Sequence, residues 1–207
     1  MYRLIKEKIL SGELPRGSRV NEQALSEELG VSRGSLRVAI RQLASDGLVD
    51  LYPFKGAYVR PLTERDIKET YEIRSLVESF AARKGMPVSA ETFHLLEQAA
   101  RGNFDELVAG NRPGAAEWDL RFHQTLVGLT QNHRLIEAWE AFYRDIMGVL
   151  ALATNPATAQ RAYQQHMAIA RALQGNNLAE AMQAIEQHLR DSLASSLEAL
   201  PEQLRSE

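Results

Sequence analysis

From residue 64 to residue 199 the sequence is a succession of helix-length segments separated by short breaks. Glycine, proline and asparagine mark these breaks, at 85–87, 110–114, 131–132, 155–156 and 175–177. No strand-like alternation of apolar and polar residues follows Val59. The pattern predicts six helices, near 64–84, 89–109, 114–130, 133–153, 157–174 and 177–199. Antiparallel helices of this length form a bundle, so this part of the chain is expected to be all-α.

The first sixty residues follow a different pattern. Asn21 and Ser32 are suited to cap two short helices, at 22–29 and about 33–45. Two short strands, 48–52 and 57–60, are predicted next, with residues 53–56 forming the hairpin loop between them. The junction lies at Pro61–Leu62, which predicts two domains, 1–61 and 62–207. The predicted fold is mainly α, with a small hairpin near the N-terminus.

The charge of the chain is unevenly distributed between these parts. The net charge is −3, which taken alone argues against a nucleic-acid partner. Residues 1–60 nevertheless hold 10 basic and 7 acidic residues, whereas the remainder holds 14 and 20. All of the basic excess lies within residues 31–60. This asymmetry predicts two modules with different partners.

The cysteine count and the hydropathy exclude several classes of protein. The chain contains no cysteine, which excludes disulfides, thiolate metal sites and thiol nucleophiles. Its longest apolar run, residues 146–153, is far shorter than the roughly 20 residues of a membrane span. Lys and Glu interrupt the first ten residues, so we expect no signal peptide and a cytoplasmic protein without a membrane partner.

The segment 22–43 has the pattern of a helix-turn-helix. The first helix is expected to turn Ala24, Leu25 and Leu29 inward. The second carries an apolar stripe made of Leu36, Ile40 and Leu43. Gly30 permits the sharp turn between the two helices.

Polar and basic residues occupy the opposite face of the second helix. Arg33, Arg37 and Arg41 are four residues apart and share a face. Arginine can contact both acceptors of a guanine in the major groove, and helix-turn-helix proteins place a helix there. The candidate DNA-binding residues are Ser32, Arg33, Ser35, Arg37 and Arg41 on the helix, with Lys55 and Gly56 on the hairpin. The alternative is that the arginines form an ordinary solvated helix face.

Metal-ligand residue types occur on three of the predicted C-terminal helices. Asp119 and His123 are four residues apart on one face, and His166 and His188 each lie on an apolar stripe of a later helix. One carboxylate and three imidazoles suit zinc, nickel, iron or manganese. The alternative is that these are hydrogen-bonded core histidines without a metal.

Arg74 lies on the first C-terminal helix among apolar neighbours. It is a candidate to hold the carboxylate of a small ligand. Its spacing equally fits an i, i+4 salt bridge with Glu78, and the sequence leaves the two interpretations open.

Residues 3–60 resemble the DNA-binding domain of the GntR family of bacterial transcription regulators. The similarity lies in residues 9–19, 25–33, 37–43, 46–49 and 56–59. It implies a winged helix-turn-helix in which Arg33 and Arg37 contact DNA from the recognition helix and Gly56 from the wing. The chain departs from the family at Gly34–Ser35, where Thr-Pro is common, at Val38, where Glu is common, and at Gln23, where some members have Arg. The resemblance therefore leaves the operator bases open.

Residues from about 62 to 200 resemble the FCD domain, the helical effector domain of the FadR subfamily. The similar segments are 71–78, 119–123, 132–135, 166–173 and 181–188. Many such domains bind a metal through an Asp and three His, which here implies Asp119, His123, His166 and His188. A domain of six helices resembles the VanR-like branch.

Together these features predict a ligand-responsive transcription regulator, with a repressor favoured by the resemblance. We expect a homodimer on a palindromic double-stranded operator. The expected effector is a small organic acid bound at the metal, with Arg74 beside it. One alternative is a regulator with a metal-free pocket. The other is a metal-dependent hydrolase, which needs a general base beside the metal. Since no further acid shares the inner stripe of His166 or His188, we expect no enzyme.

Overall fold

The computed structural model describes residues 1–207 except 11, 62, 154–155 and 201–207, and the side chains of residues 10 and 144–157 are also left aside. The chain divides into two compact units, Met1–Thr63 and Glu64–Glu207, which are described one at a time. Leu62 of the predicted junction and Asn155 of one predicted break lie outside the described residues.

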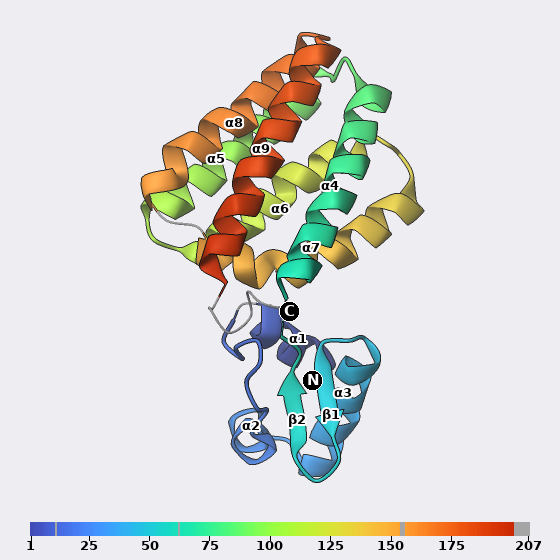
Figure 1. The fold of residues 1–207 in the computed structure, drawn as a ribbon, viewed down its shortest axis with the longest axis vertical. Coiled ribbons are helices and arrows are strands. Elements are labelled where there is room, and N and C mark those ends of the chain that lie inside the picture. The colour runs from blue at the N-terminus through green and yellow to red at the C-terminus, as the bar shows by residue number, and fades with distance from the viewer. Residues whose placement is uncertain (11, 62, 154–155, 201–207) are drawn as a thin grey trace. The chain divides into compact units, whose positions relative to one another are not determined.

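The first unit is a winged helix-turn-helix, as the sequence predicts. Its elements are α1 (Tyr2–Leu10), α2 (Glu22–Glu28), α3 (Arg33–Ser45), β1 (Val49–Tyr52) and β2 (Gly56–Val59) (Figure 1). The two strands pair antiparallel. The Asn21 side chain accepts from two backbone N–H groups at the start of α2, and Ser32 caps α3. The predicted caps are therefore observed.

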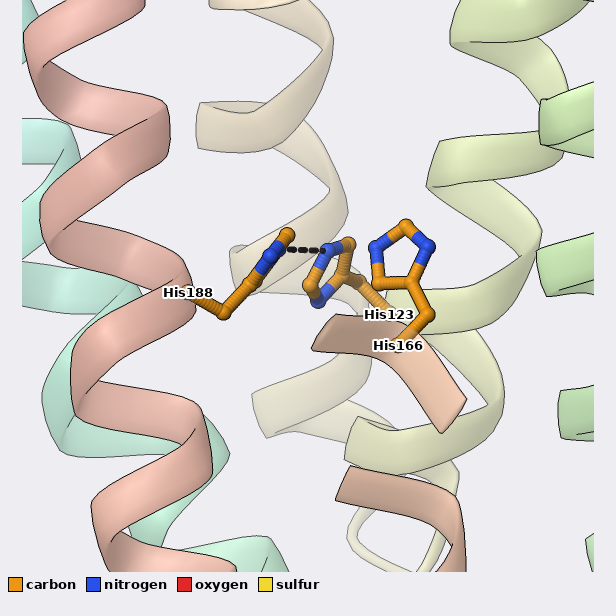
Figure 2. Close-up of side chains that lie close together, drawn as sticks. All are labelled: His123, His166 and His188. Carbon is orange, nitrogen blue, oxygen red and sulfur yellow. Dashed lines mark hydrogen bonds between the residues drawn. The ribbon is translucent and has the colours of Figure 1, made fainter. Parts of the chain in front are cut away.

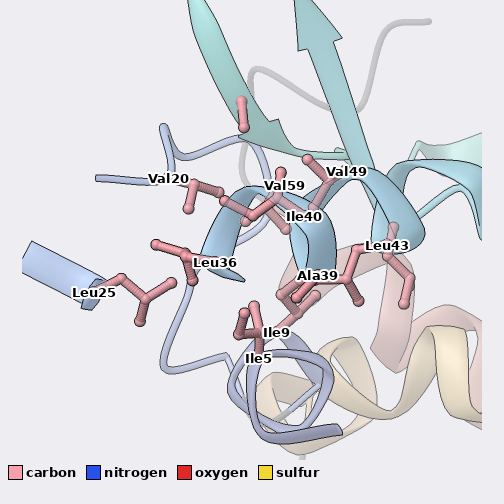
Figure 3. Close-up of a cluster of buried hydrophobic side chains, with 12 residues drawn as sticks. Ile5, Ile9, Val20, Leu25, Leu36, Ala39, Ile40, Leu43, Val49 and Val59 are labelled. Atoms are coloured by element: carbon pink, nitrogen blue, oxygen red, sulfur yellow. The ribbon is translucent and has the colours of Figure 1, made fainter. Parts of the chain in front are cut away.

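The core of this unit forms around α3 (Figure 3). Leu36, Ile40 and Leu43 are almost fully buried, as their spacing predicts. The prediction for Ala24 is wrong, because this residue is exposed. Ser26 is buried instead, and it tolerates that position because its hydroxyl donates to the Gln23 carbonyl at 2.9 Å.

The wing hairpin is tighter than the sequence indicates. Gly56 begins β2, so only residues 53–55 separate the strands. The backbone of Gly56 has φ of +99°, a conformation that side-chain-bearing residues rarely adopt. Glycine at this position lets the second strand begin directly after the turn.

The second unit contains only helices among its described residues. They are α4 (Glu64–Gly85), α5 (Ala90–Val108), α6 (Arg112–Gly128), α7 (His133–Ala153), α8 (Pro156–Gln174) and α9 (Leu178–Ala199). Helix α5 packs against α6 and α8, and α9 packs against α4 and α8. The mainly α fold is thus confirmed. None of the described helices combines the length and apolar character needed to cross a membrane.

Helix α6 begins two residues before the predicted start. Asn111 caps it by accepting from the N–H of Gly114, and Pro113 lies in the first turn. Proline is accepted there because the first N–H groups of a helix have no intrahelical partner. Pro113, which the sequence pattern assigns to a break between helices, is therefore part of the helix start.

Candidate metal centre and nucleic-acid interface

Three histidines meet in the interior of the helical unit. His123 lies on α6, His166 on α8 and His188 on α9, and their relative exposures are 0, 0 and 3%. Figure 2 shows the three imidazoles turned toward one another. One ring nitrogen from each lies within 4.8 Å of the others. The three predicted histidine ligands are brought together because each occupies an inward stripe of its own helix.

Glu78 on α4 fixes the orientation of His123. Nδ1 of His123 lies 2.9 Å from Oε2 of Glu78, and both side chains are fully buried. A carboxylate only accepts, so Nδ1 carries the proton and Nε2 presents its lone pair to the other histidines. Metal-binding histidines commonly have such a carboxylate on the second ring nitrogen. Sequence reasoning missed this contact, having considered Glu78 only as a partner of Arg74.

His188 faces His123 across a short gap. Their Nε2 atoms lie 3.1 Å apart. Nδ1 of His188 lies 3.4 Å from the amide oxygen of Gln165, to which it can donate. With the proton on Nε2 of His188 the two rings form the hydrogen bond drawn in Figure 2, and with the proton on Nδ1 both Nε2 lone pairs are available to one cation.

The buried His166 ring lacks hydrogen-bond partners among the described residues. Neither Nδ1 nor Nε2 makes a hydrogen bond, although Nε2 lies 3.3 Å from Oδ1 of Asp119. The ring stacks on Phe122 with 4.1 Å between centroids. Buried ring nitrogens without partners are costly, and a metal ion would satisfy one of them.

Asp119 lies beside the histidines at the edge of the site. Its side chain is 17% exposed, and Oδ2 is 4.0 Å from Nε2 of His123. The same oxygen accepts a hydrogen bond from the Tyr143 hydroxyl. The carboxylate is thus held in place by α7 while facing His166 and His123.

The protonation states of this cluster suit a metal ion. Burial alone would raise the pKa of Asp119, but His166 and His123 outweigh it and hold the pKa well below its usual range. Desolvation lowers the pKa of His166 and lowers that of His188 further. At neutral pH the carboxylate is charged and these two imidazoles are neutral, which are the forms that bind metals.

The spacing of one pair of donor atoms matches that of zinc ligands, and the three imidazole nitrogens, which lie within 4.8 Å of one another, have to move closer together to share one ion. Zinc–nitrogen bonds of about 2.0–2.1 Å in a tetrahedral site place two nitrogens roughly 3.3 Å apart. The 3.1 Å between His123 and His188 is close to this value. Three imidazole nitrogens and one carboxylate form a donor set typical of borderline divalent metals. The residues present therefore fit a metal.

Arg74 is buried next to the cluster. Its Nε donates to Oε1 of Glu78 at 2.9 Å, so the salt bridge that the sequence allowed is formed. Its Nη2 lies 3.0 Å from Nε2 of His123, whereas Nη1 has no partner among the described residues. Nε2 of His123 can bind a metal only if Nη2 gives up this contact, which would leave two donors for a ligand carboxylate.

A cavity of about 70 Å³ adjoins the cluster. Asp119 and His188 form part of its wall. The other lining residues include polar side chains from α5, α8 and α9, namely Asn103, Arg161, Gln165, Asp191, Ser192, Ser195 and Ser196. Two candidate metal ligands thus border a space that a small molecule can occupy.

The pKa shifts predict that the helical unit loses stability as the pH falls. For His166 and His188 the folded pKa is below the unfolded value of about 6.5. The stabilisation is therefore present above pH 6.5 and is lost as the pH falls below it, by at most about 1.4 kcal/mol per pH unit for each group. The measurement is urea unfolding of chelator-treated protein between pH 7.5 and 5, followed by tryptophan fluorescence.

The control for this experiment is His188→Gln, which should give a shallower pH dependence. Both tryptophans of the chain, Trp118 and Trp139, lie in the helical unit, so their fluorescence reports on that unit alone. A free energy of unfolding that changes equally with pH in both proteins would contradict the assignment.

The predicted DNA-binding residues of the first unit are exposed or partly exposed. Arg33, Arg37 and Gly56 line one groove of about 740 Å³ between α3 and the wing. Arg41 and Lys55 are exposed but are not among its lining residues. Arg19 also lines the groove, and sequence reasoning missed it. Its only local signal is its position before the cap of α2, since its pairing with Tyr58 of the wing is a long-range contact.

Two contacts among the candidate DNA-binding residues limit how freely their side chains can reach DNA. Nε of Arg37 forms a 2.6 Å ion pair with Glu22 while 62% of the Arg37 side chain remains exposed. The Ser32 hydroxyl accepts from the N–H of Ser35, and the two hydroxyls lie 3.0 Å apart. The serines therefore stabilise the start of α3 in addition to any contact with DNA.

Comparisons with known proteins agree with both units. The family described as bacterial regulatory proteins of the gntR family matches residues 1–59, and the FCD domain family matches residues 69–191.

Similar proteins match much of the chain. A probable D-xylose utilization operon transcriptional repressor from Paenarthrobacter nicotinovorans is 31% identical over 87% of this chain and 80% of that protein. The gluconate operon transcriptional repressor of Bacillus licheniformis is 29% identical over 65% of this chain and 56% of that protein. The fold matches that of a GntR-type regulator from Rhodococcus sp. RHA1, with a TM-score of 0.82, 24% identity and 97% of each chain covered.

Proposed function

The chain belongs to the GntR family of bacterial regulatory proteins and carries an FCD domain, and we propose that it is a repressor whose operator affinity is set by a small carboxylic acid. It is a DNA-binding transcriptional regulator and not an enzyme, as its family and relatives show. The metal-dependent hydrolase is thereby rejected. The metal, the acid and the homodimer are parts of the proposal.

The observation that carries the proposal is the convergence of three buried histidines beside a cavity. Asp119, His123, His166 and His188 would hold the ion. A bound divalent metal supplies positive charge that can attract a carboxylate. Because Asp119 and His188 also line the cavity, a ligand in it would lie next to that charge.

Arg74 would contribute the second contact to the carboxylate. It carries one buried donor without a partner and a second that now contacts His123. Glu78 keeps the guanidinium in place through Nε, so Nη1 and Nη2 can form a two-pronged contact. Arg74 would thus serve as ion-pair partner and ligand contact at once.

Regulation requires that the acid bind two arrangements of the protein with different affinity. Two winged units in a homodimer would contact two half-sites of a palindrome. A ligand that favours an arrangement in which the half-site spacing no longer matches would release the operator. Relatives named as a probable repressor of a D-xylose utilization operon and as a repressor of a gluconate operon support the role of repressor.

The metal-free pocket is a second candidate, since His123 already contacts Arg74, Glu78 and His188. Such a network can also position a carboxylate by hydrogen bonds alone.

The test uses full-length protein and a duplex selected from a random DNA library by that protein. We expect a palindromic duplex that binds two copies of the chain, with an affinity that small carboxylates change by about 5- to 150-fold. The carboxylate effect should disappear after chelation and return with zinc or nickel. An effect that survives chelation would favour the metal-free pocket, and a single copy on a non-palindromic site would contradict the homodimer.

A further inference from the structure

One residue that lines the cavity beside the histidine cluster carries a buried acceptor that the proposed carboxylate cannot satisfy. Asn103 of α5 lines this cavity and is 2% exposed. Its Nδ2 donates to the Ala115 carbonyl at 2.8 Å, which fixes the orientation of the amide. Its Oδ1 has no hydrogen-bond partner among the described residues.

A buried acceptor without a partner favours a ligand that brings a donor. A carboxylate has only acceptor atoms, so it cannot serve Oδ1. A hydroxyl can donate to Oδ1 and remains neutral, which suits a cavity near a proposed metal ion and Arg161.

The neighbouring polar groups do not supply this donor. The Ser196 hydroxyl donates to the Ser192 carbonyl at 2.8 Å. The Gln165 amide donates to Asp191 at 2.6 Å. These two donors on the cavity wall are therefore engaged elsewhere, whereas Oδ1 of Asn103 has no hydrogen-bond partner among the residues that the structure describes.

We propose that the cavity binds a short hydroxycarboxylic acid, with a ligand hydroxyl donating to Oδ1 of Asn103. This inference rests on the proposed function, because it assumes that the carboxylate lies at the metal and Arg74. The cavity of about 70 Å³ has room for about five to seven non-hydrogen atoms, if each water-sized position needs roughly 10–15 Å³. Asn103 would then select the hydroxy acid over the simple acid.

The first experiment needs no variant. Binding of glycolate, lactate and 3-hydroxypropionate to zinc-loaded full-length protein is measured by calorimetry and compared with acetate and propionate. We expect the best hydroxy acid to bind about 10- to 100-fold more tightly than its deoxy analogue. Methylation of the hydroxyl of the best hydroxy acid should remove its advantage over the deoxy acid, because the ether oxygen remains but the O–H donor is lost. Alanine and glycine are included, and tighter binding of either amino acid would overturn the assignment of a hydroxyl.

The second experiment removes the acceptor. In Asn103→Leu the ratio of hydroxy-acid to deoxy-acid affinity should fall to within about threefold of unity. The ratio is measured within one protein, so a partial loss of folded protein affects both ligands alike. Gln98→Leu on the exposed side of the same helix is the matched control and should keep the wild-type ratio.

The outcomes separate this inference from the proposed function. Equal binding of hydroxy and deoxy acids to the wild-type protein would overturn the role of Asn103. Water would then be the donor to its Oδ1, and the carboxylate site would remain as proposed. A preference that persists in Asn103→Leu would also overturn it. Failure of every carboxylate to bind the metal-loaded protein would overturn both.

Discussion

The double substitution His123→Ala/His188→Ala should lower the affinity of the protein for zinc or nickel by more than about 100-fold. Loss of a residue that merely supports a metal ligand costs about 10- to 100-fold, and loss of two ligands costs more. The two Nε2 atoms lie 3.1 Å apart, so the substitution removes both donors on one side of the site. Elemental analysis of purified protein and competition with a chromophoric chelator measure the effect.

The matched control is His94→Ala/His133→Ala, which removes two imidazoles that are exposed. This variant should retain metal at the wild-type level. Circular dichroism and tryptophan fluorescence show whether the buried substitutions leave the helical unit folded. A wild-type protein without bound metal, or equal metal content in both variants, would contradict the proposed centre.

A second large effect is expected in the first unit. Arg37→Ala should weaken binding to the selected operator by about 5- to 150-fold, because a guanidinium contact with guanine contributes roughly 1–3 kcal/mol of discrimination. Binding to random-sequence DNA should fall much less. Fluorescence anisotropy at several salt concentrations measures both affinities. Equal loss on both DNAs, with a salt slope reduced by about one, would mean that Arg37 contacts phosphate alone.

The ion pair between Arg37 and Glu22 has to be separated from the DNA contact. Loss of Arg37 leaves the Glu22 carboxylate in the groove, where it repels phosphate. The combined variant Glu22→Gln/Arg37→Ala removes this repulsion. It should still fail to distinguish the operator from random-sequence DNA. Arg3→Ala on α1 is the control for the loss of one exposed charge from the same unit. If Arg3→Ala has as large an effect as Arg37→Ala, the contact is not specific.

Much of the fold could be predicted because its signals are local. The caps at Asn21 and Ser32 and the stripe of Leu36, Ile40 and Leu43 depend on residues only a few positions apart. The errors arose where a residue departed from the usual preference of its type, such as a buried serine or a proline within a helix. Ser26 tolerates burial because the Gln23 carbonyl accepts from its hydroxyl, and Pro113 lies in the first turn of a helix instead of preceding it.

The candidate site was accessible from the sequence in part. The apolar neighbours of each histidine predict that its side chain points into the bundle. Packing of the three helices then brings together His123, His166 and His188. The sequence did not indicate that Glu78 contacts His123, because an ion pair with Arg74 four residues away already accounts for a glutamate at this position. Arg19 and Asn103 were missed for a different reason, because the groove and the cavity that give them a role are formed by segments distant in the sequence.

The sequence alone determined the order of the helices, the two-part organisation and the residue types available for DNA and metal. These follow from periodicity, capping and local charge, which act over a few residues. Only the tertiary structure decided which nitrogen of His123 faces the cluster, that Asp119 is held by Tyr143, and that Oδ1 of Asn103 lacks a donor. Such properties depend on which side chains from different helices come within about 3 Å of each other, since hydrogen bonds act only at that range.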